Sequence, residues 1–268
     1  MHLPLKFKKI LLRVIDGFYS LMPQPCPASE RLKNCKIISH RGEYNNSEIL
    51  ENTIAAFDKA LSCGIWGVEF DVRWTRDLQP VVFHDMDCQR LFGSELVIQQ
   101  VTFAQLQKAF PVIPLLAEVI QKFGKKMHLM VEIKKEVYPE PAYQKRILRD
   151  LFSTLEPEKD YHFLALHPEM FHAVDFLPPS TFLPIARLNL RELSAMSIHE
   201  NFGGIAGHYS LLTDEMISKH KKHGQQVGTG YVGSKNCLFR ELNRGVDWIF
   251  SNNASEIQSL VHSLSDAR

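Results

Sequence analysis

The chain has 268 residues, of which 45% are hydrophobic and 23% charged, a composition typical of a folded globular protein and unlike that of a disordered or collagen-like chain. It carries 31 lysines and arginines against 30 aspartates and glutamates, so no overall charge favours nucleic acid as a partner. The cysteines are scattered and form no C-x-x-C pair. This argues against a zinc site or a secreted disulfide framework and favours reduced thiols in the cytoplasm.

The N-terminal residues predict an amphipathic helix. Apolar and basic side chains occupy opposite faces over residues 5–22, and prolines from Pro23 onward end the pattern. The apolar face consists of Phe7, Ile10, Leu11, Val14, Ile15, Phe18 and Met22. Charged residues interrupt the run, so we expect neither a signal peptide nor a membrane span here. We expect residues 1–35 to form a separate segment, either packed on the rest of the protein or in peripheral contact with an anionic membrane.

From residue 36 onward, short apolar runs alternate with longer segments of helical period. We expect strands at 37–40, 66–72, 127–133, 162–166, 182–186, 203–207, 226–230 and 247–251. We expect helices near 53–63, 102–123, 141–155, 168–176, 189–200, 213–223, 236–244 and 254–264. Eight strand–helix units predict an α/β fold, a (β/α)8 TIM barrel over residues 36–268. A doubly wound open sheet is the alternative, because it also alternates strands and helices.

Several helix ends carry recognisable signals. Asn52 and Thr213 are candidate N-caps, and Thr102 with Gln105 has the spacing of a capping box. Glycines that stand just before strands are expected to adopt the left-handed conformation at helix ends. They are Gly64, Gly124, Gly224 and Gly245.

One apolar run breaks the alternation and predicts an extra β-hairpin strand. Residues 80–84 follow the second strand after a loop too short for a crossover helix, so the two runs are expected to pair antiparallel. If the turn centres on residues 77–78, Asp71 faces His84 across the hairpin.

Three carboxylates lie inside strands where an unpaired charge is unfavourable. Glu69 and Asp71 belong to the second strand and Glu132 to the third. Together they predict a hard oxygen site for one divalent cation, Mg²⁺ or Ca²⁺. The alternative is a structural salt-bridge network with Arg41, Arg73 and Lys134.

Two histidines at strand ends, His40 and His84, are candidates for a general acid/base pair, because imidazole titrates near neutral pH. Arg41 and Lys134 bring positive charge to the same rim, where it suits a phosphoryl oxygen. Gly42 is expected to let the backbone approach the ligand closely. With the carboxylates, this set predicts metal-assisted displacement at phosphorus.

The sequence resembles the glycerophosphodiester phosphodiesterase family, a group of (β/α)8 barrels, from about residue 36 to 255. The matching motifs, in order, are His40-Arg41-Gly42, Glu51-Asn52-Thr53, Glu69-Phe70-Asp71-Val72, His84-Asp85 and Glu132-Ile133-Lys134, with a weaker match at 245–250. The resemblance implies hydrolysis of a glycerophosphodiester to sn-glycerol 3-phosphate and an alcohol such as choline or ethanolamine.

The resemblance also assigns roles to the candidate residues. His40 and His84 would be the general acid and base, and Arg41 would bind the phosphate with Lys134 beside it. One divalent cation would be held by Glu69, Asp71 and Glu132.

The chain departs from the family pattern at the substrate rim. Leu50 replaces a proline, the region ending in Tyr231 lacks the usual tryptophan, and Ser251-Asn252 replaces Thr-Asp. These changes leave the alcohol open, and Tyr231 is a candidate to stack on a substrate group.

Three other functions remain possible on the residues alone. The first is a lysophospholipase D-type phosphodiesterase acting on membrane lysolipids, which would give the N-terminal helix a purpose. The second is a non-catalytic barrel that binds a phosphorylated ligand. The third is a metal-dependent aldolase or enolase-type barrel, which the lack of a lysine base inside a strand makes less natural.

Overall fold

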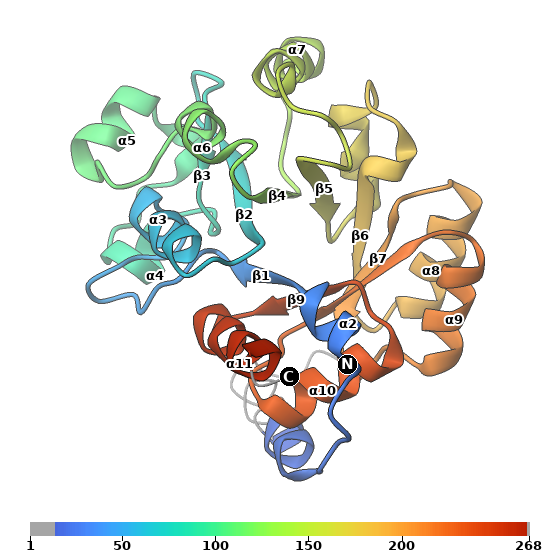
Figure 1. Cartoon of the computed structure of the whole chain (residues 1–268). Helices are drawn as coiled ribbons and strands as arrows, with labels where there is room; N and C mark the ends of the chain where they lie inside the picture. Colours follow the sequence, from blue (N-terminus) through green and yellow to red (C-terminus); the bar gives the residue numbers. More distant parts are fainter. Residues whose placement is uncertain (1–13, 267–268) are drawn as a thin grey trace.

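The alternating segments form a closed barrel of parallel strands surrounded by helices (Figure 1). The computed structural model describes residues 14–266. The strands are β1 (Lys36–His40), β2 (Gly67–Trp74), β3 (Pro80–Val82), β4 (His128–Ile133), β5 (Tyr161–Ala165), β6 (Phe182–Ala186), β7 (Gly204–His208), β8 (Gln226–Gly230) and β9 (Trp248–Ser251). β1 pairs with both β2 and β9, which closes the barrel, and β3 pairs antiparallel with β2 outside it. The predicted TIM barrel with an added hairpin strand is therefore confirmed.

Helices follow the barrel strands along the chain. They are α2 (Ser29–Lys33), α3 (Ile54–Ser62), α4 (Gln89–Phe92), α5 (Phe103–Ala109), α6 (Leu116–Phe123), α7 (Pro141–Phe152), α8 (Leu190–His199), α9 (Asp214–Lys222), α10 (Lys235–Arg244) and α11 (Ala254–Asp266). Short 3-10 turns are η1 (Ile98–Gln100), η2 (Pro168–Val174) and η3 (Pro179–Thr181). The predicted helix at 168–176 is η2, and the predicted helix at 102–123 is wrong. It is two helices, α5 and α6, because Pro111 and Pro114 interrupt it.

The strands are buried on both faces, as expected of parallel strands covered by helices. One apolar cluster fills the barrel interior, and a larger one lies between the strands and the helices. The interior cluster consists of Ile38, Met130, Leu164, Leu183, Ala206, Trp248 and Phe250.

The hairpin register differs by one residue from the prediction. Val72 pairs with Val82, and the Phe83 N–H donates to the Asp71 carbonyl at 2.9 Å, so Asp71 faces Phe83 and not His84. Leu78 adopts a left-handed conformation (φ 58°) and closes a three-residue loop where we expected a two-residue turn.

Most helix-end predictions are confirmed, and two are wrong. The Thr102–Gln105 capping box and the Thr213 cap are present, as are positive φ values at Gly64, Gly224 and Gly245. Thr53, not Asn52, caps α3, because Asn52 itself is left-handed (φ 59°). Gly124 has φ −52°, and the left-handed residue is its neighbour Lys125.

The N-terminal helix spans residues 14–21 in the described chain and packs on the barrel. The Tyr19 ring meets the Tyr209 ring edge-on, with centroids 5.4 Å apart, and the Ser20 carbonyl accepts a hydrogen bond from Asn236. Of the predicted apolar face, Phe7, Ile10 and Leu11 lie outside the described residues. Val14 and Phe18 are exposed, as is Met22 just past the helix. The boundary at residue 35 stays a prediction.

No helix among residues 14–266 is long and apolar enough to span a bilayer.

Candidate active site

The predicted carboxylate cluster forms where β1, β2 and β4 lie side by side. The strand register places His40 beside Glu69 and Asp71 beside Glu132. Side chains on a strand repeat every two residues, so Glu69 and Asp71 share the inner face of β2. Glu69, Asp71 and Glu132 are buried, and each offers an oxygen within 4.8 Å of the others.

The cluster combines features of the two arrangements expected from the sequence, a divalent-cation site and a structural salt-bridge network. Lys134 Nζ lies 2.5 Å from Asp71 Oδ1 and 2.5 Å from Glu132 Oε1, and Arg41 Nε lies 3.4 Å from Asp71 Oδ2. Glu69, in contrast, has two buried oxygens that accept no hydrogen bond from a described residue. The ion pairs therefore leave one carboxylate uncompensated, which fits a site that holds an added cation.

The electrostatics of the cluster agree with this fit. Burial, together with the charges of Asp71 and Glu132, raises the pKa of Glu69 well above its usual value. Burial also raises the pKa of Glu132. Burial alone would raise the pKa of Asp71, but Lys134 and Arg41 outweigh it and hold that pKa low. Added positive charge beside Glu69 and Glu132 would favour their ionised forms.

His40 is held between two residues from the far end of the chain. Its Nδ1 lies 2.7 Å from Asn252 Oδ1, and its Nε2 lies 3.2 Å from the Tyr231 hydroxyl and 3.7 Å from Glu69 Oε2. Burial and the neighbouring Arg41 lower the pKa of His40 to about 3, so the ring is neutral at pH 7. With Asn252 accepting from Nδ1–H, Nε2 is the nitrogen that can accept a proton.

His84 is oriented by its own sequence neighbour. Its Nδ1 lies 2.7 Å from Asp85 Oδ1, and burial lowers the pKa of His84. Its backbone carbonyl accepts a hydrogen bond from Arg73 Nε at 2.8 Å. Arg73 in turn pairs with Glu136 at 3.1 Å, so it does not take part in the salt-bridge network that was the alternative to a metal site. Arg73 supports the His84 backbone instead.

A chain of ion pairs links the two histidine motifs. Arg90 bridges Asp85 Oδ2 and Glu51 Oε1, each at 2.6 Å, and Glu51 Oε1 lies 2.8 Å from Arg41 Nη1. The network fixes Arg41, whose backbone is left-handed (φ 62°). Arg90 was not predicted, because it lies outside the predicted strands and the quoted motifs.

Gly42 and Asn52 have structural roles close to the cluster. A Cβ on Gly42 would lie 2.7 Å from Ala56 Cβ, so the missing side chain lets the segment after β1 approach α3. The expected close approach of this backbone to a ligand stays a prediction. Asn52 Nδ2 donates to Asp71 Oδ2 at 2.8 Å, which explains its left-handed backbone better than a capping role does.

Catalysis in (β/α)8 barrels takes place at the carboxyl ends of the strands, where the polar groups of this chain gather. The protein is therefore a barrel enzyme. The model of the glycerophosphoryl diester phosphodiesterase family matches residues 40–254, and the chain belongs to this family.

Full-length relatives agree with this assignment. The chain is 26% identical over 244 residues to a glycerophosphodiester phosphodiesterase of Caldanaerobacter subterraneus subsp. tengcongensis, covering 84% of this chain and 97% of the relative. A Bacillus altitudinis glycerophosphodiester phosphodiesterase is 26% identical over 238 residues, covering 81% of this chain and 94% of the relative.

Solved structures share the fold. An Oleispira antarctica phosphodiesterase, in complex with the product sn-glycerol-3-phosphate, superimposes with a TM-score of 0.71 at 24% identity over 91% of this chain and 98% of that one. A Thermotoga maritima glycerophosphodiester phosphodiesterase superimposes with a TM-score of 0.70 at 21% identity, over 84% of this chain and 98% of that one.

Proposed function

We propose that the protein hydrolyses glycerophosphodiesters to sn-glycerol 3-phosphate and an alcohol, with one divalent cation, Mg²⁺ or Ca²⁺, and a histidine pair. The family match supports the reaction class. The observation that carries the proposal is Glu69, whose buried carboxylate lacks a hydrogen-bond partner in the described chain and lies 3.7 Å from His40. Glu69, Asp71 and Glu132 would hold the cation. When bound, it supplies positive charge to the phosphoryl oxygens and activates an attacking hydroxyl or water.

The side chains of the protein supply proton transfer and phosphate binding. His40, whose Nε2 is the unprotonated nitrogen, and His84, oriented by Asp85, act as the general acid/base pair, each contributing roughly 10²–10⁴ in rate. Arg41 binds the phosphate, and Lys134 adds positive charge beside Asp71 and Glu132.

The test is release of sn-glycerol 3-phosphate from glycerophosphodiesters that differ in their alcohol. It is run with Mg²⁺, with Ca²⁺ and with EDTA, on the wild type, His40→Ala and Glu69→Gln. We expect release that needs metal and falls by at least about 100-fold in both variants. The control is His199→Ala, an exposed histidine on α8, which should keep full activity. Release that persists in EDTA or in Glu69→Gln would refute the metal role.

A second candidate is lysophospholipase D-type activity on membrane lysolipids. It is favoured by the exposed apolar side chains of the N-terminal helix, where Phe18 is 60% and Leu21 82% exposed. Peripheral membrane contact through residues 5–22 belongs to this proposal, and the five free cysteines agree with a cytoplasmic location. Faster cleavage of micellar lysophosphatidylcholine than of glycerophosphocholine, lost on Phe18→Ser with Leu21→Ser, would support it. Cleavage of neither would leave a binding-only barrel.

A further inference from the structure

Arg90, on the short helix α4, binds two carboxylates of the site at once. Its Nε donates to Asp85 Oδ2 at 2.6 Å. Its Nη2 donates to Glu51 Oε1 at 2.6 Å, and its Nη1 donates to Glu51 Oε2 at 3.0 Å. The guanidinium group is planar and rigid, so it fixes the two carboxylates relative to each other in a way that the single ammonium of a lysine does not.

Each of these carboxylates in turn holds a side chain of the proposed reaction. Asp85 Oδ1 lies 2.7 Å from His84 Nδ1, and Glu51 Oε1 accepts a hydrogen bond from Arg41 Nη1 at 2.8 Å. Burial alone would raise the pKa of Glu51, but hydrogen bonds from Arg90 and the charge of Arg41 lower it to about 2. Glu51 is therefore a carboxylate at neutral pH, and one carboxylate separates Arg90 from His84 on one side and from Arg41 on the other.

The backbone around Arg90 is anchored by apolar packing. Cys88 is fully buried in an apolar cluster formed by β3 and the segments that follow it. The Phe92 ring stacks on the Phe110 ring, with centroids 4.2 Å apart. These contacts fix the chain on both sides of Arg90, although 44% of the Arg90 side chain itself is exposed. The position of its guanidinium is therefore set from outside the barrel strands.

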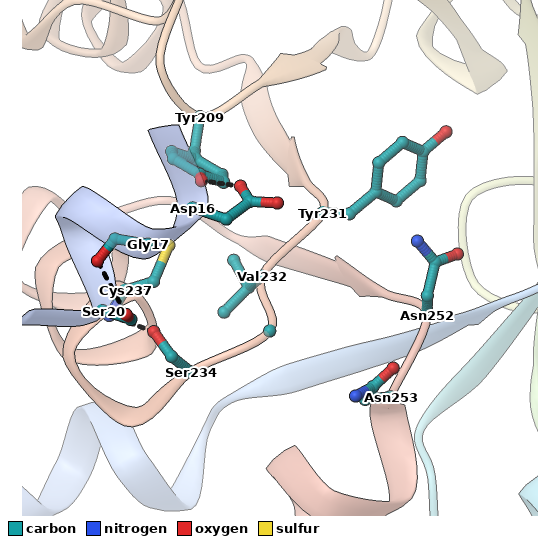
Figure 2. Close-up of a pocket in the computed structure, with 11 residues that line it drawn as sticks. Asp16, Gly17, Ser20, Tyr209, Tyr231, Val232, Ser234, Cys237, Asn252 and Asn253 are labelled. Atoms are coloured by element: carbon teal, nitrogen blue, oxygen red, sulfur yellow. Dashed lines mark hydrogen bonds between the residues drawn. The ribbon is translucent and has the colours of Figure 1, made fainter. Parts of the chain in front are cut away.

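His40 is supported by a different set of contacts. Its ring contacts Asn252 and Tyr231, which line a cavity of about 330 Å³ at the ends of β8 and β9 (Figure 2). Within residues 14–266, no hydrogen bond or ion pair joins Arg90 to either of them. The two histidines are therefore oriented by separate networks, and only the one that holds His84 passes through Arg90.

We propose that Arg90 is a positioning residue that couples the orientation of His84 to that of Arg41. The inference rests on the proposed diester hydrolysis, in which His84 transfers a proton and Arg41 binds the phosphate. Because Asp85 and Glu51 share one guanidinium, a displacement of either carboxylate is passed to the other. Proton transfer and phosphate binding are in this way set by the same residue.

The first test is the steady-state kinetics of Arg90→Ala on glycerophosphocholine with Mg²⁺. We expect kcat/KM to fall roughly 100-fold. The loss should divide between the two parameters, with kcat lowered because His84 is misplaced and KM raised because Arg41 is. Arg146→Ala is the matched control, because it removes an exposed arginine on α7 that lies over the Tyr143 ring, and it should keep full activity. A loss confined to kcat or to KM would contradict the coupling.

Double variants separate the two networks. Arg90→Ala combined with Asp85→Asn should lose less activity than the product of the two single losses, because both changes remove the same support of His84. Arg90→Ala combined with Asn252→Ala should lose the full product, because Asn252 supports His40. Full multiplication of the losses in both double variants would show that Arg90 does not act through Asp85.

A measurement by NMR at fixed pH needs no substrate. Glu51→Gln should shift the ring Cε1–H signal of His84, which is identified by its loss in His84→Gln. The shift should disappear when Glu51→Gln is made in Arg90→Ala, because the connection to Asp85 is then absent. A His84 signal that ignores Glu51→Gln, or that responds equally without Arg90, would overturn the coupling whether or not the protein cleaves a diester. If no diester is cleaved but this response is present, only the proposed hydrolysis is refuted.

Discussion

His40 Nδ1 lies 2.7 Å from Asn252 Oδ1, although 212 residues separate them. Closure of the barrel through the β1–β9 pairing brings the two together. Because Asn252 accepts from Nδ1–H, it holds His40 in the tautomer whose Nε2 faces Glu69 and Tyr231.

Loss of this contact should slow catalysis without unfolding the protein. We expect Asn252→Ala to lower kcat about 10- to 100-fold, since the ring loses its orientation, and Asn252→Asp to recover most of that loss. Steady-state kinetics on a glycerophosphodiester would measure this. Asn253→Ala is the control, because Asn253 lines the same cavity but makes no contact with His40. Equal effects of both alanine variants would contradict a role specific to Asn252.

Arg73 and Glu136 form a buried ion pair under the His84 backbone. Arg73→Ala leaves the Glu136 carboxylate buried without its cation and should reduce the free energy of unfolding by about 3–5 kcal/mol. Adding Glu136→Gln should restore part of it, because burial already raises the pKa of Glu136 to about 7 and the amide still accepts from the Trp74 N–H. Urea unfolding of both single variants and the double variant measures the coupling, and strictly additive losses would rule it out.

Gly42 combines positive φ with close packing, whereas Gly93 has positive φ alone. A Cβ on Gly42 would meet Ala56 and Phe57 within 2.8 Å, and a Cβ on Gly93 would meet nothing within 4 Å. We expect Gly93→Ala to lower stability by about 1 kcal/mol and Gly42→Ala by about 2 kcal/mol or more. Thermal or urea unfolding compares them, and similar losses would show that packing against α3 is not the constraint.

Two buried histidines at the opposite end of the barrel make stability depend on pH. His128 Nε2 lies 2.8 Å from His162 Nδ1, and His128 Nδ1 lies 3.0 Å from the Lys159 carbonyl. Burial lowers the pKa of His128 to about 4, and burial together with His128 lowers the pKa of His162 to about 3.

The direction of the pH effect follows from these lowered values. Below the unfolded pKa of about 6.5 the unfolded chain binds protons that the folded chain does not, so stability falls as the pH drops from 6.5 toward 4. For His128 alone the loss between pH 7.5 and pH 5 is about 2 kcal/mol. Urea unfolding of His128→Gln with His162→Gln should show a flatter profile over this range. His199→Gln changes an exposed histidine and should leave the pH profile of stability unchanged. An unchanged profile in the His128→Gln, His162→Gln double variant would contradict the role of these two histidines in the pH effect.

The fold was accessible from the sequence because its pattern is regular. Every predicted barrel strand is found within two residues at each end, and the carboxylates gather as the strand period requires. The hairpin register was predicted wrongly because one residue adopts a backbone conformation that its type disfavours. Leu78 adopts a left-handed conformation that leucine rarely takes, and it shifted the hairpin register by one residue.

The parts of the site that were not predicted depend on contacts between distant segments. The support of His40 by Asn252, and the pairing of Arg73 with Glu136 instead of the cluster, follow from barrel closure and side-chain direction. Neither contact can be inferred from the spacing of these residues along the sequence.

The central claim, displacement at phosphorus, is tested most directly by hydrolysis of glycerophosphocholine in water enriched in oxygen-18. Mass spectrometry of the products locates the label. The account predicts one heavy oxygen in the phosphate of sn-glycerol 3-phosphate and none in choline. Release of both products should be lost in Glu69→Gln and in His40→Ala. Label in the released choline, or no release of sn-glycerol 3-phosphate from any glycerophosphodiester, would contradict it.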